Sequence, residues 1–153
     1  MSSVDKEQFD YITSERFIHD GLIRTSQAVV EEACKAWDEG QLKRGAFALV
    51  WPTSTVKDDG GNPISRAVVM ELPEEARRFA ALNALVQRTG AYGLLVIDLQ
   101  ERALVAKFET AHGARVWTIP IEWHGDRREM GDQRVKDNAE CVGLLWSPAR
   151  GRA

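Results

Sequence analysis

Three acidic residues and one histidine in the second half of the chain have side chains that could hold a divalent metal ion. Glu109 ends one predicted strand, and Glu122, His124 and Asp126 lie at the end of the next. Hard divalent ions bind clustered carboxylate oxygens, and a metal-bound water can attack a phosphodiester. These four residues are therefore the catalytic candidates of an Mg²⁺- or Mn²⁺-dependent phosphodiester hydrolase. The competing interpretation is that Glu109 and Glu122, which alternate with apolar neighbours, form only the solvated face of a sheet.

The same region carries side chains that are suited to binding rather than to catalysis. Trp123 is followed by Arg127 and Arg128, and Arg115 lies near the start of the same predicted strand. An exposed Trp beside Arg can stack on a base, a sugar or a side chain of a partner. We therefore expect these four residues to form a binding surface, whereas Trp51, Trp117 and Trp146 are expected to fill the core.

Recognisable catalytic and cofactor motifs are absent from the sequence. It contains no nucleophile elbow, phosphate-binding loop or dinucleotide fingerprint, and no histidine or cysteine spacing typical of zinc. Cys34 and Cys141 are far apart, which favours two buried thiols over a disulfide. We therefore expect no cofactor, unless the metal-dependent alternative holds.

Hydrophobic periodicity and punctuation residues predict the elements of the first half of the chain. The predicted elements are a short helix or arm within 1–22 that breaks at 18–21, a helix from Thr25 and Ser26 to Gly40, a strand over 45–51, a loop over 53–63 and a strand over 66–71. A helix begins at Pro73, carries an apolar stripe of Phe79, Leu82, Leu85 and Val86, and ends at Gly90.

The second half is predicted to be mostly strands. They cover 92–97, 104–109 and 115–123, followed by a charged loop or short exposed helix over 124–140, a buried strand over 141–146 and a frayed tail over 148–153. His112 falls in the turn Thr110–Gly113. Pro120 lacks the N–H that a central strand donates, so the strand 115–123 is expected at a sheet edge or bulge, where a partner or a second copy of the chain would dock.

From Glu74 onward, the order of helix, three strands, charged segment and strand is similar to the core of metal-dependent nucleases of the PD-(D/E)xK type. The resemblance implies metal ligands at Asp98 or Glu109 together with Glu122. The sequence departs from the family motif, because His124 stands where the motif has its lysine and no Pro-Asp pair occurs at the second strand.

Composition limits the remaining possibilities. With 153 residues, 44% hydrophobic and 28% charged, the chain is expected to be a single domain over 1–153, with no disorder and no membrane span. Its start has no basic and apolar leader, which predicts a cytoplasmic protein, and its Arg and Ala content is typical of GC-rich bacteria or phages. The net charge of -3 disfavours nucleic acid as a partner.

The sequence therefore predicts an α+β fold, a mostly antiparallel sheet of five to six strands with two main helices packed on it. The predicted function is a small non-catalytic binding or regulatory protein that recognises an unknown protein or a small ligand. The metal-dependent hydrolase is the alternative.

Overall fold

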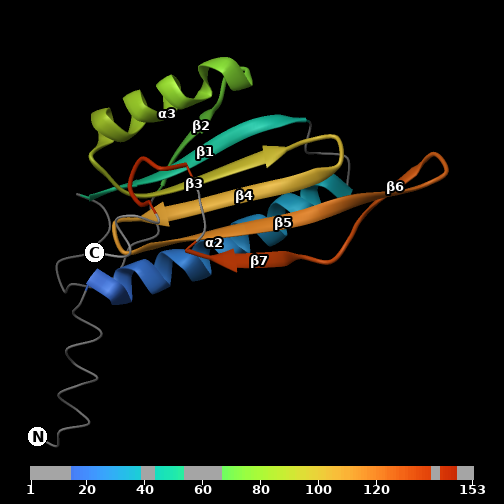
Figure 1. Cartoon of the computed structure of the whole chain (residues 1–153), viewed down its shortest axis with the longest axis horizontal. Helices are drawn as coiled ribbons and strands as arrows, with labels where there is room; N and C mark the ends of the chain where they lie inside the picture. The colour runs from blue at the N-terminus through green and yellow to red at the C-terminus, as the bar shows by residue number, and fades with distance from the viewer. Residues whose placement is uncertain (1–14, 39–43, 54–66, 139–141, 148–153) are drawn as a thin grey trace, which may run out of the picture.

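One antiparallel sheet with a helix on each face forms the body of the molecule (Figure 1). The computed structural model describes residues 15–38, 44–53, 67–138 and 142–147. The helices are α2 (Glu15–Asp38) and α3 (Glu75–Thr89), and the strands are β1 (Gly45–Pro52), β2 (Val68–Glu71), β3 (Ala91–Leu99), β4 (Ala103–Thr110), β5 (Gly113–His124), β6 (Arg127–Met130) and β7 (Arg134–Asp137). The strand order is β2-β1-β3-β4-β5-β6, and β7 also pairs with β5. The α+β prediction is confirmed, with seven strands instead of five or six.

Helix α2 is one continuous helix, so the predicted break at residues 18–21 is wrong. Ile18, Leu22, Ser26 and Val30 follow one another at intervals of four and are all buried on one helix face. Ser26 is therefore a polar member of the buried stripe and not an N-cap, and Thr25 donates its hydroxyl to the Gly21 carbonyl within the helix, at 3.1 Å. The part of the predicted first helix before residue 15, and the predicted stop at Gly40, lie outside the described residues.

The segment from β1 to β3 follows the sequence prediction closely. β1 and β2 pair antiparallel, and α3 ends at Gly90, which has the left-handed φ of 60°. Most of the predicted loop over 53–63 lies outside the described residues. Pro73 precedes α3 instead of opening it, and Phe79 was wrongly assigned to the buried stripe, because its side chain is 59% exposed.

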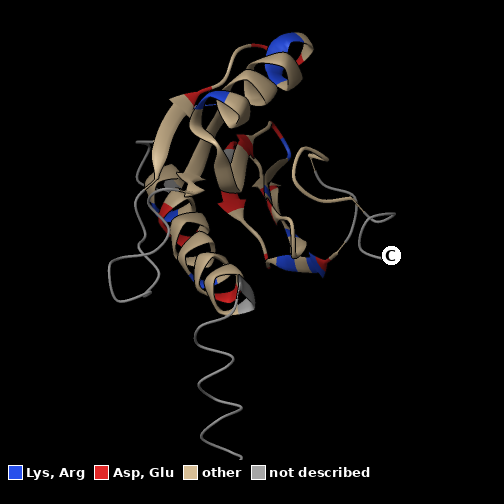
Figure 2. Cartoon of the chain, turned by 90° about the vertical axis from the view of Figure 1, so that its left-hand side faces the viewer, with Lys and Arg blue, Asp and Glu red and all other residues tan. Residues whose placement is uncertain are grey.

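Each face of the sheet has its own apolar core. Side chains alternate along the strands, so that Trp51, Phe108 and Trp117 face α2 while Val50 and Leu94 face α3. Strand β3, predicted over 92–97, lies between β1 and β4 and is buried on both faces. The two helices lie on opposite sides of the sheet (Figure 2). The core under α3 has fewer buried residues than the core under α2, and the main strand contacts of α3 are with β1 and β3. The α3 face of β4 and β5 is therefore left to other segments.

Strand β5 does not lie at the sheet edge, so this half of the prediction from Pro120 is wrong, but the pairing on its outer side is interrupted at Pro120. On its outer side, residues 115–118 pair with β7 and residues 121–124 pair with β6. Pro120 falls in the gap between these two pairings, and its carbonyl accepts a hydrogen bond from the Gly131 N–H on that side. A backbone N–H at position 120 would point into the same gap, where the pairing with β6 and β7 does not need a donor, so proline is tolerated there.

Two further predictions for the C-terminal third are wrong. The charged segment 124–140 contains the short strands β6 and β7 instead of a loop or an exposed helix. The apolar run 142–146 is irregular and not a strand, and Gly143 has a φ of 85° there. Residues 148–153, the predicted tail, are outside the described residues. Among the described helices, neither has the length and apolar character needed to cross a membrane.

Candidate binding site

The carboxylate of Glu109 is fully buried and serves the fold rather than the surface. It accepts five backbone hydrogen bonds from the segment 142–146, with Oε1 bound by the N–H groups of Val142 and Gly143 and Oε2 by those of Leu144, Leu145 and Trp146, at 2.5 to 3.2 Å. A carboxylate offers about four lone-pair positions, so five amide donors saturate it. Glu109 therefore has no oxygen left to offer a metal ion.

The structure separates Glu109 from the other three catalytic candidates. Glu109 is paired with Ala114 across the β4–β5 ladder, and Glu122 lies eight positions farther along β5. At about 3.4 Å per residue, the two carboxylates are roughly 27 Å apart. In the described part of the chain, no group of three or more His, Cys, Asp or Glu side chains is placed to hold a metal ion. These residues do not fit the Mg²⁺ or Mn²⁺ site.

The remaining candidates gather on the β5–β6 hairpin, which projects beyond the other strands (Figure 1). Trp123 faces Arg128 and His124 faces Arg127 across the hairpin, and Asp126 lies in its turn. The Trp123 side chain is 49% exposed. The structure thus brings an aromatic side chain, two arginine positions and a histidine together at one tip.

Acidic side chains flank His124 on this hairpin. Its Nε2 atom lies 3.4 Å from an oxygen of Glu129 and 3.9 Å from an oxygen of Glu122, and all three side chains are more than half exposed. Exposed ion pairs of this kind contribute about 0 to 1 kcal/mol to stability. The cluster is therefore a feature of the surface chemistry and not a support of the fold.

The hairpin projects because β5 extends beyond the end of β4, the strand on its inner side. The last paired residue of β5 against β4 is Pro120, opposite Ala103, and the Ile121 N–H makes one further bond to the Arg102 carbonyl. From residue 122 onward, β6 is the one strand among the described residues that pairs with β5, and the two form a ribbon. Gly125, with a φ of 68°, allows the tight turn at the tip.

Arg115 does not belong to this group, although the sequence placed it there. It lies eight positions before Trp123, at the opposite end of β5, and forms a bidentate ion pair with Asp137 of β7, at 2.5 and 3.1 Å. The hydrogen bond to Asp137 raises the pKa of Arg115, against a smaller opposing effect of burial. Arg115 connects β5 to β7 and is not available at the hairpin tip.

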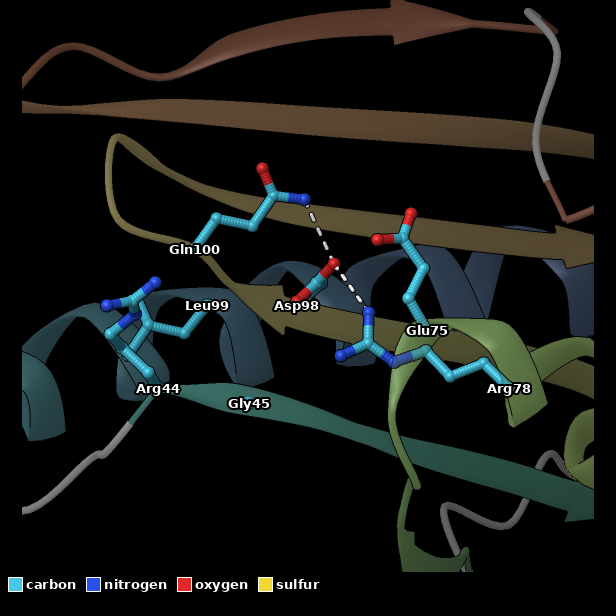
Figure 3. Close-up of a pocket in the computed structure, with 7 residues that line it drawn as sticks. All are labelled: Arg44, Gly45, Glu75, Arg78, Asp98, Leu99 and Gln100. Atoms are coloured by element: carbon cyan, nitrogen blue, oxygen red, sulfur yellow. Dashed lines mark hydrogen bonds and ion pairs between the residues drawn. The ribbon is translucent and has the colours of Figure 1, made fainter.

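A second polar site, which the sequence analysis missed, is a hollow of about 440 Å³ between the start of α3 and the turn after β3 (Figure 3). Arg78 of α3 donates to Asp98 of β3 at 3.0 Å, and the Gln100 amide donates to the same carboxylate at 2.9 Å. Arg44 and Glu75 complete its polar lining. These segments come together only through tertiary packing, so no local sequence pattern predicts the site.

Comparisons with protein-family models, with curated proteins and with solved structures find no match for this chain.

Proposed function

We propose that this chain is a small, cytoplasmic, non-catalytic binding protein whose recognition element is the β5–β6 hairpin. The observation that carries the proposal is Trp123, which is 49% exposed on a ribbon that extends beyond the sheet. A folded protein gains by burying a tryptophan, and Trp is enriched among the residues that dominate binding interfaces. The partner is either another protein or a second copy of this chain.

The backbone of the hairpin supports the same proposal. β6 is the last strand in the order of the sheet and pairs with β5 on one side only. A short edge strand of this kind can add a strand from a partner, with main-chain hydrogen bonds providing affinity and side chains providing specificity. Trp123 and the arginine positions 127 and 128 would then contact the partner's side chains.

Two observations favour binding over metal-dependent hydrolysis. The Glu109 carboxylate is saturated by backbone amides, and it lies at the far end of β5 from Glu122, His124 and Asp126. The three hairpin residues are exposed, whereas a catalytic metal site is normally held in a shaped cavity that excludes water.

Site-specific photo-cross-linking tests this proposal. A photoreactive phenylalanine analogue placed at position 123 should cross-link one defined protein in extracts of the source organism, and the purified pair should bind with a measurable Kd. The control position is Val69 on β2, which is 64% exposed and far from the hairpin in the strand order. Light scattering on the purified chain then distinguishes a partner from a second copy.

Substitutions in the hairpin complete the test. Trp123→Ala and Arg128→Glu should each weaken binding of the purified partner at least tenfold, since truncating a central Trp or Arg typically costs 2 kcal/mol or more. Val69→Ala should leave the Kd unchanged. A partner that cross-links equally from both positions, or binds Trp123→Ala as tightly as the wild type, would refute the assignment to the hairpin.

A further inference from the structure

A continuous groove runs under the N-terminal half of α3, on the face of the sheet that α3 covers only in part. The polar hollow of Figure 3 adjoins a second hollow of about 390 Å³, and the two share Glu75, Arg78, Asp98 and Gln100. Each volume lies within the range of about 300 to 1,000 Å³ that is typical of small-molecule sites. The groove is therefore large enough to hold a small organic ligand.

The second hollow has apolar walls, and one of them is unusually exposed. Leu82 of α3 and Val105 of β4 line it, together with Phe79. The Phe79 ring is 59% exposed, although it lies on the same helix as the buried Leu82 and Leu85. A ligand with a hydrocarbon body would cover this ring and remove apolar surface from water at about 25 cal/mol per Å².

The charges in the groove favour an anion. Arg78 and Asp98 neutralise each other, with both side chains about one-fifth exposed. Lys107 is half-buried in the second hollow between Val96 and Val116 of the adjacent strands, and within the described residues it has no ion pair. Arg44, at the other end of the groove, likewise has no ion pair among the described residues. Asp98 is already paired with Arg78, so Glu75 is the one remaining lining carboxylate that can offset the positive charges of Lys107 and Arg44.

We propose that this groove binds a small organic anion with an apolar body, of the class of alkyl carboxylates. The carboxylate pairs with Lys107, and the alkyl chain lies on Phe79, Leu82 and Val105. A cation that is half-buried among valines gains more from an anionic partner than an exposed cation does, since the local dielectric constant is lower. This site is separate from the hairpin and does not depend on the function proposed for it.

Titration of ¹⁵N-labelled full-length chain with octanoate, followed by amide chemical shifts, tests the proposal. Saturable shifts should concentrate on α3 and on β3 and β4 around Asp98 and Lys107. Octan-1-ol, which has the same chain without the charge, should bind at least tenfold more weakly. The absence of saturable shifts at these amides up to the solubility limit, or equal binding of the alcohol, overturns the proposal.

Variants assign the roles of the individual side chains. Lys107→Met should weaken octanoate at least tenfold and leave octanol unchanged, while Phe79→Ser should weaken both. Glu75→Gln removes the opposing carboxylate, so it should strengthen octanoate binding about two- to fivefold, which a merely destabilising substitution would not do. Lys35→Met, which changes an exposed lysine of α2 on the opposite face of the sheet, is the matched control and should have no effect.

Unchanged octanoate binding in folded Lys107→Met, or equal weakening in Lys35→Met, contradicts the assignment. Trp123→Ala should bind octanoate like the wild type. The groove and the hairpin can therefore fail independently of each other.

Discussion

Two glutamates, Glu109 of β4 beside the start of β5 and Glu122 near the end of β5, have opposite roles. At one end, the Glu109 carboxylate opposite Ala114 is fully buried and holds five backbone N–H groups of the segment 142–146. At the other end, Glu122 is more than half exposed beside His124 on a two-stranded ribbon. The difference shows that a carboxylate at a strand end becomes structural where a chain segment folds over it, and remains exposed where none of the described segments covers it.

Glu109→Gln is expected to have the largest effect on stability. The amide has one oxygen in place of two acceptors, and its N–H₂ group must face one of the two sets of backbone N–H groups that the carboxylate binds. Leaving buried donors unsatisfied around a lost charge should lower the free energy of unfolding by about 3 to 5 kcal/mol. Urea denaturation monitored by tryptophan fluorescence measures this change.

The matched control is Glu122→Gln, which makes the same chemical change at the end of β5 that pairs with β6. It should alter the free energy of unfolding by less than about 0.5 kcal/mol. Similar values for the two variants would break the comparison between the two ends.

Gly113→Ala changes the end of β5 that lies beside Glu109 and should lower the free energy of unfolding by about 1 to 3 kcal/mol. A Cβ atom at this position would lie 2.8 Å from Oδ1 of Asn138 and 3.3 Å from Nε2 of His19, which is itself buried and bonded to Thr110. Thermal unfolding should show a clear decrease in Tm. A neutral result would mean that His19 and Asn138 move apart without cost, and that this end is less tightly packed than the structure indicates.

Asp137→Asn should have a smaller effect, below about 1 kcal/mol, because the ion pair with Arg115 is partly exposed and screened by solvent. The raised pKa of Arg115 should fall back toward its usual value, since its main cause is the hydrogen bond from Arg115 to Asp137. The difference from wild type should shrink as salt is added to the unfolding experiment. A difference that is independent of salt would indicate a packing role for Asp137 instead.

Trp123→Ala should lower the free energy of unfolding by no more than about 2 kcal/mol, because half of the side chain is already exposed in the folded state and only the remaining burial is lost. Circular dichroism and urea denaturation would test this. A loss of several kcal/mol would show that Trp123 is part of the core and would remove the main support for the hairpin as a recognition element.

Local patterns predicted the parts of this fold that depend on local physics. Pro73, the apolar spacing of Leu82, Leu85 and Val86, and Gly90 specify α3 within a few residues. The predicted strands over 92–97 and 104–109 fall within β3 and β4. These features need no knowledge of distant segments, which is why sequence reasoning succeeds with them.

The failures depend on contacts between distant segments. Ser26 resembles an N-cap in sequence, but tertiary packing buries it inside α2. Pro120 suggests a sheet edge because it lacks a backbone N–H. The sequence around it does not show that this missing donor falls between the β6 and β7 pairings. The role of Glu109 depends on residues more than thirty positions later in the chain.

Native-state hydrogen exchange tests the central comparison most directly, because it reports on both ends of β5 in one experiment. The account predicts slow exchange, approaching that of the core strands, for the amides of Gly143, Leu144, Leu145 and Trp146, although they belong to no helix or strand. The amides of the β5–β6 ribbon beyond Ile121 should exchange much faster. Fast exchange at 143–146, or protection of the hairpin equal to that of β3 in the absence of a partner, would contradict it.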